Sequence, residues 1–283
     1  AHVRFRLDLG SRYQDAIGAG MIFYSDRVNI LEFNTNQLGF STAFHKGLDD
    51  DKKQVLSLGL QASVVQRNLN YENLTFEDQF NGTSGYTGST AEVLPENNFA
   101  FADFSVGLNY SYNPSERTVF ILGGAIHHFN NPRISFYDPS TDPNVEESEG
   151  ENLYPRYSGQ LMVEFPITKD RSVSLSPRAL FTTQGPHASV TAGSNIRFKL
   201  PAIVNMGMQV GGWARPVKNE DGSWEVDAIA ALLGFEVSGL FIGLSYDVNL
   251  DDVSNYRQGQ NAFEISISYI GEYEDETILC PSF

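Results

Sequence analysis

The stretch FADFSVGLNYSY (101–112) shows most clearly how this chain folds. From Phe104 to Tyr112 every second residue is large and apolar, and the residues between them are polar or small. Side chains of a β-strand point alternately to the two faces of its sheet. The stretch therefore predicts a strand with one apolar face and one polar face.

The same period-two pattern returns along the whole chain, and no comparable helical periodicity appears. We therefore expect an all-β, antiparallel fold. The pattern predicts thirteen strands, at 2–13, 16–25, 34–46, 54–67, 99–113, 117–129, 154–167, 171–184, 187–200, 203–215, 224–236, 239–249 and 261–272.

The length of these strands helps to distinguish a membrane-spanning β-barrel from a soluble all-β protein. Several exceed ten residues, whereas strands of soluble proteins average about 5–6 residues and a tilted membrane-spanning strand needs about 9–11. Long strands with one clean apolar face predict a transmembrane outer-membrane β-barrel. The alternative is a soluble β-sandwich or a large lipocalin-like barrel. Strand length and the near absence of charge from the apolar face disfavour it.

The connections between the predicted strands alternate between short and long, and only Gln184–Pro186 breaks this rule. Outer-membrane barrels have short periplasmic turns, longer extracellular loops and an even number of strands. We therefore expect about 14 strands, thirteen in this chain and one upstream of residue 1, with the C-terminus in the periplasm and the long loops outside. Residues 1–272 are expected to form a single barrel domain, and residues 273–283 a periplasmic tail.

The composition of the chain excludes some classes of partner and some kinds of site. The 35 Asp and Glu against 19 Lys and Arg give a net charge of −16, which disfavours nucleic acid as a partner. A single cysteine, Cys280, excludes an internal disulfide and a multi-thiolate metal site. No segment has the apolar length of a transmembrane helix. Residues 1–20 carry too many charges for a signal peptide, so we expect that any export leader has been removed.

We expect no catalytic residue, no cofactor and no metal site. His127 and His128 are adjacent, and on a strand their rings would point to opposite faces. The acidic run of Asp247, Asp251 and Asp252 and the acidic segment 142–151 lack the spacing of a known calcium loop, so solvated loops are the simpler interpretation. No catalytic motif occurs in a suitable context. The protein is therefore not expected to be an enzyme.

Several segments, in collinear order, resemble the PorP/SprF family of outer-membrane proteins of the Bacteroidetes type IX secretion system. They are IGAGMIFYSDRV (17–28), LSLGLQASVVQRNLNYENLTFEDQF (56–80), FADFSVGLNY (101–110), ILGGAIHHFNNPRISF (121–136), GLSYDVNL (243–250), AFEISISY (262–269) and CPSF (280–283). The N-terminal NPA-type motif of the family is absent, and Ser282 stands where the family commonly has arginine. The resemblance implies a non-enzymatic barrel that takes part in the export of cargo bearing a type IX C-terminal signal domain. In gliding bacteria it further implies pairing with a cell-surface adhesin.

A protein partner is expected on the two longest connections, Asn68–Asn98 and Asn130–Leu153. Aromatic side chains dominate protein–protein binding energy, and long loops without regular structure are uncommon unless they serve binding or are disordered. The candidate partner-binding residues are Tyr71, Phe76, Phe80, Tyr86, Leu94, Phe136 and Tyr137.

Three other possibilities remain open at this stage. One of the long loops folds inward and plugs the barrel. The protein is a channel for small or apolar solutes, because fourteen strands enclose a lumen wider than side chains can fill. The barrel is a scaffold that holds other secretion components in the periplasm through the tail that contains Cys280.

Overall fold

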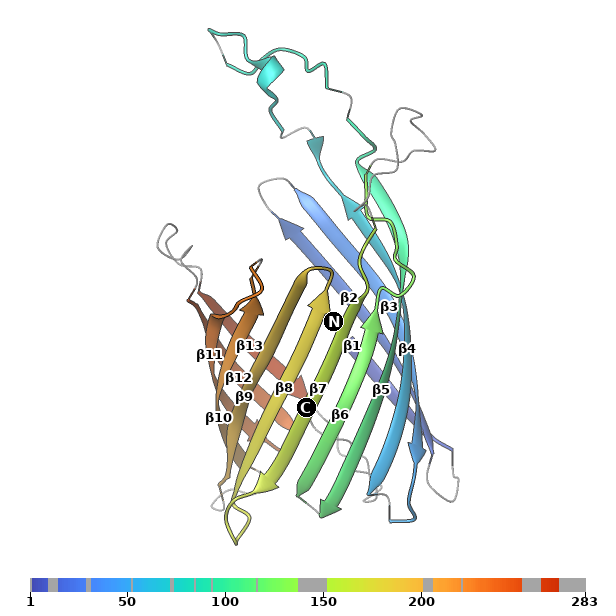
Figure 1. Cartoon of the computed structure of the whole chain (residues 1–283), viewed down its shortest axis with the longest axis vertical. Coiled ribbons are helices and arrows are strands. Elements are labelled where there is room, and N and C mark those ends of the chain that lie inside the picture. The colour runs from blue at the N-terminus through green and yellow to red at the C-terminus, as the bar shows by residue number, and fades with distance from the viewer. Residues whose placement is uncertain are drawn as a thin grey trace.

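The fold is one continuous sheet that coils around a central axis (Figure 1). The computed structural model describes residues 2–9, 15–28, 32–51, 53–71, 74–83, 85–92, 94–115, 117–136, 152–200, 206–219, 221–250 and 261–269. The strands are β1 (His2–Asp8), β2 (Ala16–Val28), β3 (Phe33–Gly47), β4 (Gln54–Asn68), β5 (Asn98–Ser115), β6 (Thr118–His127), β7 (Arg156–Pro166), β8 (Val173–Gln184), β9 (His187–Lys199), β10 (Met206–Lys218), β11 (Trp224–Val237), β12 (Leu240–Asn249) and β13 (Ala262–Tyr269).

Each strand pairs antiparallel with the next one along the chain, in the order β1 to β13. The prediction of an all-β, antiparallel chain is confirmed. Strand ends differ from the predicted ones mostly by a few residues. The largest difference is in β1, whose described part ends at Asp8 rather than at residue 13. Pro216 lies inside β10 where the register with β11 shifts between Arg215 and Pro216, and such bulges are positions at which a sheet tolerates proline.

The exposure of side chains is the reverse of that in a soluble protein. Leu108 and Ile265 are 55% and 60% exposed on the outer face, whereas Ser63 and Asp103 on the inner face are only 4% and 5% exposed. A soluble protein buries large apolar residues and exposes polar ones. An apolar exterior around a polar interior is the pattern of a membrane barrel, and it rules against the soluble alternative.

The strand registers place large apolar residues of neighbouring strands on the same, outer side of the sheet. Leu58 stands opposite Leu108, and Leu122 stands opposite Leu161. Gln160, next to Leu161, lies on the inner face, where its amide donates to Asn109 Oδ1 at 3.3 Å. The inward and outward faces inferred from alternation are therefore the ones that the structure has.

Most long connections lie at one end of the barrel and most short ones at the other, although the two-residue β8–β9 turn is a short connection at the upper end. The β3–β4, β5–β6 and β7–β8 turns are short and lie at the lower end in Figure 1, whereas the β4–β5 connection extends far beyond the upper end. No described pairing joins β1 to β13. The strand inferred upstream of residue 1 stays a prediction, as do the sides of the membrane on which the two ends lie.

Among the residues that the structure describes, no helix has the length and apolar character needed to span a membrane. The segment 270–283, which includes the predicted tail and Cys280, lies outside the described residues.

Candidate functional site

The feature that stands out from the barrel is the connection between β4 and β5, residues 69–97, which we call the arm. It projects away from the upper end of the sheet (cyan in Figure 1) and does not enter the barrel. The arm is therefore not the inward plug that the sequence left open.

The base of the arm is fixed to the barrel by polar contacts. The Leu69 backbone N–H donates to the Asn97 carbonyl at 2.9 Å, which brings the two ends of the arm together. Asn70 donates to Glu32 Oε2 at 2.6 Å, and Arg27 pairs with Glu32 Oε1 at 2.8 Å. The Asn70 hydrogen bond and the charge of Arg27 together lower the pKa of the Glu32 carboxyl, because both favour its ionised form.

The outer part of the arm has its own internal order. The carboxylate of Asp78, within the short helix Glu77–Gln79, accepts hydrogen bonds from the Thr90 hydroxyl and, at 2.6 Å, from the Ala91 backbone N–H. The Gly88 N–H donates to the Gln79 carbonyl at 3.1 Å. These bonds join the outgoing and returning sides of the arm. The tip is therefore held in place by contacts within the arm as well as by the contacts at its base.

The tip, residues 79–88, is a small hairpin with two aromatic rings on it. Phe80 and Tyr86 form an isolated antiparallel bridge, with ring centroids 5.3 Å apart. Gly82 and Gly85 have φ of +77° and +100°, a region that glycine enters without steric cost. Phe80 and Tyr86 are 54% and 56% exposed. The turn therefore presents a paired aromatic surface to the surroundings.

The other candidate partner-binding residues lie in several places. Tyr71 is half-buried near the base, Phe76 is half-buried before the short helix, and Leu94 is exposed on the returning side of the arm. Tyr137 lies outside the described residues. Of the predicted set, the structure brings Phe80 and Tyr86 together, and the role of all seven in binding stays a prediction.

Phe136 belongs to an aromatic cluster at the base of the arm instead. Its ring packs edge-to-face on Phe99 at 4.7 Å and lies 6.2 Å from Phe33. Phe99 in turn stacks on Phe101, over which the Arg67 guanidinium lies at 5.6 Å. This cluster was not predicted from the sequence. Phe99 and Phe101 lie four and two residues before Asp103 in the same strand, so alternation places all three on the inner face, and this could have indicated the cluster.

The histidine pair is arranged differently from the sequence expectation. His127 ends β6 and contacts Ser158 Oγ at 3.2 Å, whereas His128 follows the strand with a φ of +57° and contacts Asp103 Oδ1 at 2.8 Å. The left-handed turn breaks the alternation, so the expectation that the rings point to opposite faces is wrong. Across the described ranges, no group of three or more His, Cys, Asp or Glu residues gathers closely enough to hold a metal ion.

Comparison with solved structures shows the fold. The chain is similar to the crystal structure of BamA from Haemophilus ducreyi lacking POTRA domains 1–3, with a TM-score of 0.50 and 11% identity. The alignment covers 95% of this chain and 62% of that one. The chain thus spans less than two thirds of the BamA chain, and the likeness is one of β-barrel architecture.

Comparison with sequences shows the family. No curated protein matches this chain. The family model described as type IX secretion system membrane protein PorP/SprF matches residues 1–269, nearly the whole chain. With the coiled antiparallel sheet and its apolar exterior, this match identifies the chain as a member of the PorP/SprF family of type IX secretion system outer-membrane β-barrels.

Proposed function

We propose that this barrel binds a secreted surface protein through the arm, and so anchors that cargo at the cell surface or helps its export. The cargo is engaged through its C-terminal signal domain, as the family resemblance implies. The protein acts by binding and not by catalysis. Other secretion components are proposed as partners on the periplasmic side.

The observation that carries this proposal is the aromatic pair at the tip of the arm. Binding energy at protein interfaces is concentrated in a few aromatic and arginine side chains, and Phe80 and Tyr86 are both more than half exposed. The hairpin holds them before a partner arrives, which lowers the ordering cost of binding. An exposed pair of rings on a cross-linked arm is an arrangement suited to a protein partner.

The negative charge of the arm indicates what kind of surface a partner would present to it. The arm sequence 69–97 contains five acidic residues and no Lys or Arg. A surface rich in basic residues around an apolar pocket would match both the charge and the rings. We propose that the cargo presents such a surface.

The proposal places the arm outside the cell. Long connections at one end and short turns at the other are typical of outer-membrane barrels, in which the long loops are extracellular. The lower end in Figure 1, with its short turns, then faces the periplasm.

A test in cells separates binding from assembly. The double variant Phe80→Ser/Tyr86→Ser should assemble in the outer membrane at normal levels but release cargo into the medium. The matched control is Thr83→Ala/Ser89→Ala, which changes two polar side chains of the same segment and should retain cargo. Normal retention of cargo by the aromatic variant, with the barrel present, would refute the role of the arm.

A channel for small or apolar solutes is the second candidate. It is favoured by the course of the arm, which leads away from the barrel. Single-channel recordings in a planar bilayer distinguish the two functions. Stable conductance steps would support the channel, and their absence would support a barrel that serves as a docking platform.

A further inference from the structure

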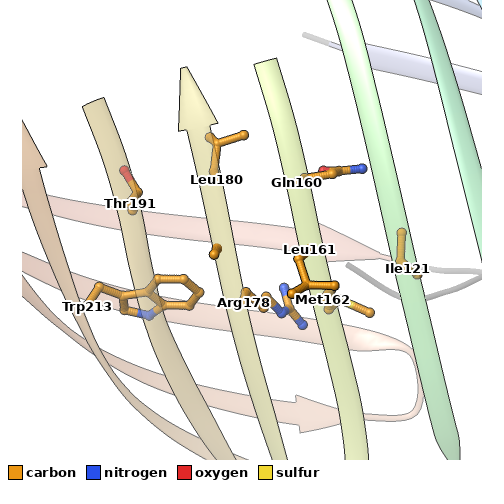
Figure 2. A pocket seen from close by; sticks show the side chains of 9 residues that line it. Ile121, Gln160, Leu161, Met162, Arg178, Leu180, Thr191 and Trp213 are labelled. Carbon is orange, nitrogen blue, oxygen red and sulfur yellow. The ribbon is translucent and has the colours of Figure 1, made fainter. Parts of the chain in front are cut away.

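A row of side chains crosses the inner wall of the barrel from β6 to β10. Ile121 stands opposite Met162, Met162 opposite Arg178, Arg178 opposite Gly193, and Gly193 opposite Trp213. Residues directly opposite in a ladder share a face of the sheet. Next to this row lie Gln160, Leu180 and Thr191, at a second level in Figure 2.

These two rows, together with Leu161 of β7 and Ala179 of β8, line a hollow of about 220 Å³. Its wall combines apolar surface from Ile121, Met162 and Leu180 with the indole of Trp213, the guanidinium of Arg178 and two uncharged polar side chains. A mostly apolar hollow with a few polar groups is the usual composition of a small-molecule site.

The position of the indole is determined by two glycines and a hydrogen bond. A Cβ at Gly193 would collide with the Trp213 ring, and one at Gly211 would collide with the Asn195 amide. Asn195 is buried and accepts a hydrogen bond from Trp213 Nε1 at 3.1 Å. The bare backbone at both positions lets the indole lie against the wall beside Arg178, so this part of the hollow is pre-organised.

Two other arginines of the same wall have acidic partners. Arg197 donates to Glu236 at 2.8 Å, and Arg215 pairs with Asp227 at 3.0 Å and with Asp247 at 3.3 Å. Within the described part of the chain, by contrast, the side chain of Arg178 forms no ion pair and no hydrogen bond, and its Nε is shielded from solvent without a partner. Glu164 lies on the same face of the sheet, but no ion pair within 4.0 Å joins it to Arg178.

From this geometry we propose that the hollow binds an organic carboxylate that carries an aromatic or other apolar group. The carboxylate accepts hydrogen bonds from Arg178, whose planar fork matches it. The apolar group lies against Trp213 and Leu180. A cavity of about 150 Å³ accommodates benzene, so the larger hollow has room for a ring with a short acidic arm. The site is on the barrel wall and does not depend on cargo binding by the arm.

Two sources offer this chemistry, a small organic acid and the C-terminal carboxylate of a polypeptide. Trp213 provides the measurement, since the chain has two tryptophans and Trp224→Phe leaves Trp213 as the single indole. This protein, in lipid nanodiscs, is titrated with phenylacetate and with acetyl-glycyl-phenylalanine. Each acid is compared with its neutral amide, which has nearly the same shape.

We expect saturable changes of Trp213 emission, with each acid that binds at least tenfold tighter than its amide. Arg178→Gln should abolish this preference, and Arg178→Lys should retain part of it. Arg156→Gln, which removes an arginine of the inner wall outside the hollow, should leave it unchanged. Binding of the peptide acid alone would assign the site to a polypeptide terminus, and binding of phenylacetate would assign it to small acids.

Equal binding of acids and amides would overturn the proposal, as would an acid preference that survives Arg178→Gln. If Arg178→Gln fails to assemble, the comparison of acid with amide in the parent protein and in Arg178→Lys still decides the question.

Discussion

Phe80 and Tyr86 pair across a turn at the tip of the arm, with their ring centroids 5.3 Å apart and their ring planes at 51°. The pair depends on the turn between them, which closes through the Asn81 N–H bonded to the Gly85 carbonyl at 3.1 Å. The backbone of the turn holds both rings in place while they remain exposed to solvent, without packing in a core. The binding surface and the turn are therefore one unit.

Gly85→Ala is expected to loosen the tip without affecting the barrel. Gly85 has a φ of +100°, and a side chain in that region costs on the order of 1–3 kcal/mol. Hydrogen exchange of the Gly88 amide, which bonds to Gln79 across the hairpin, should become at least several-fold faster. Thr83→Ala is the control. Unchanged exchange in Gly85→Ala would mean that the turn does not hold the tip.

Leu161 and Gln160 are neighbours in β7 on opposite faces of the sheet. Leu161→Arg should destabilise the protein in lipid vesicles by about 2–4 kcal/mol if the position lies near the bilayer midplane. Gln160→Arg should cost clearly less, because its side chain faces the polar interior. Urea unfolding in vesicles measures both. Equal costs would show that the assignment of the two faces is wrong.

Gly193→Ala should destabilise the inner wall and displace the indole of Trp213. An added Cβ meets the Trp213 ring and the Gly212 carbonyl, and overpacking of this kind costs about 1–3 kcal/mol. Gly159→Ala is the matched control, since a Cβ at that strand position has no atom within 4 Å. A shift of Trp213 emission in Gly193→Ala alone, together with a lower urea midpoint, is the expected result. Equal behaviour of the two variants would contradict the close approach.

The base of the arm should loosen in acid. The pKa of Glu32 is lowered by the Asn70 hydrogen bond and by Arg27, so the ionised carboxylate stabilises the folded base. That contribution is complete above the ordinary glutamate pKa of about 4.3 and is lost as the pH falls through the lower pKa of the folded state. A spin label at Ser89 should become more mobile over this range. Glu32→Gln should be mobile at neutral pH and nearly independent of pH, and the same pH response in Glu32→Gln would exclude Glu32 as its source.

Alternation was sufficient to predict the strands and their faces. The strand expected at 54–67 is β4, Gln54–Asn68, and the one expected at 187–200 is β9, His187–Lys199. The side-chain period of a strand is two, so the inward or outward position of each residue follows once the strand is recognised. Membrane barrels make this signal strong because both faces have a definite polarity.

Alternation cannot predict which residues of distant strands become neighbours. It assigns Arg178, Gly193 and Trp213 to one face, but their common row depends on the registers of β8 with β9 and of β9 with β10. The packing of Phe136 on Phe99 of β5 depends in the same way on the course of the connection that follows β6. His128 escaped prediction because a single residue with positive φ ends the alternation after β6.

The central claim, that the tip of the arm contacts the cargo, is tested most directly by site-specific photo-crosslinking in intact cells. A benzophenone amino acid is placed at Phe80, at Tyr86 and, as a control, at the lipid-facing position Leu122, which is exposed on the outer face of β6. The account predicts crosslinks to a secreted surface protein from positions 80 and 86 and none from position 122. Absence of a cargo crosslink at both tip positions, with the barrel assembled and cargo present at the surface, would contradict it.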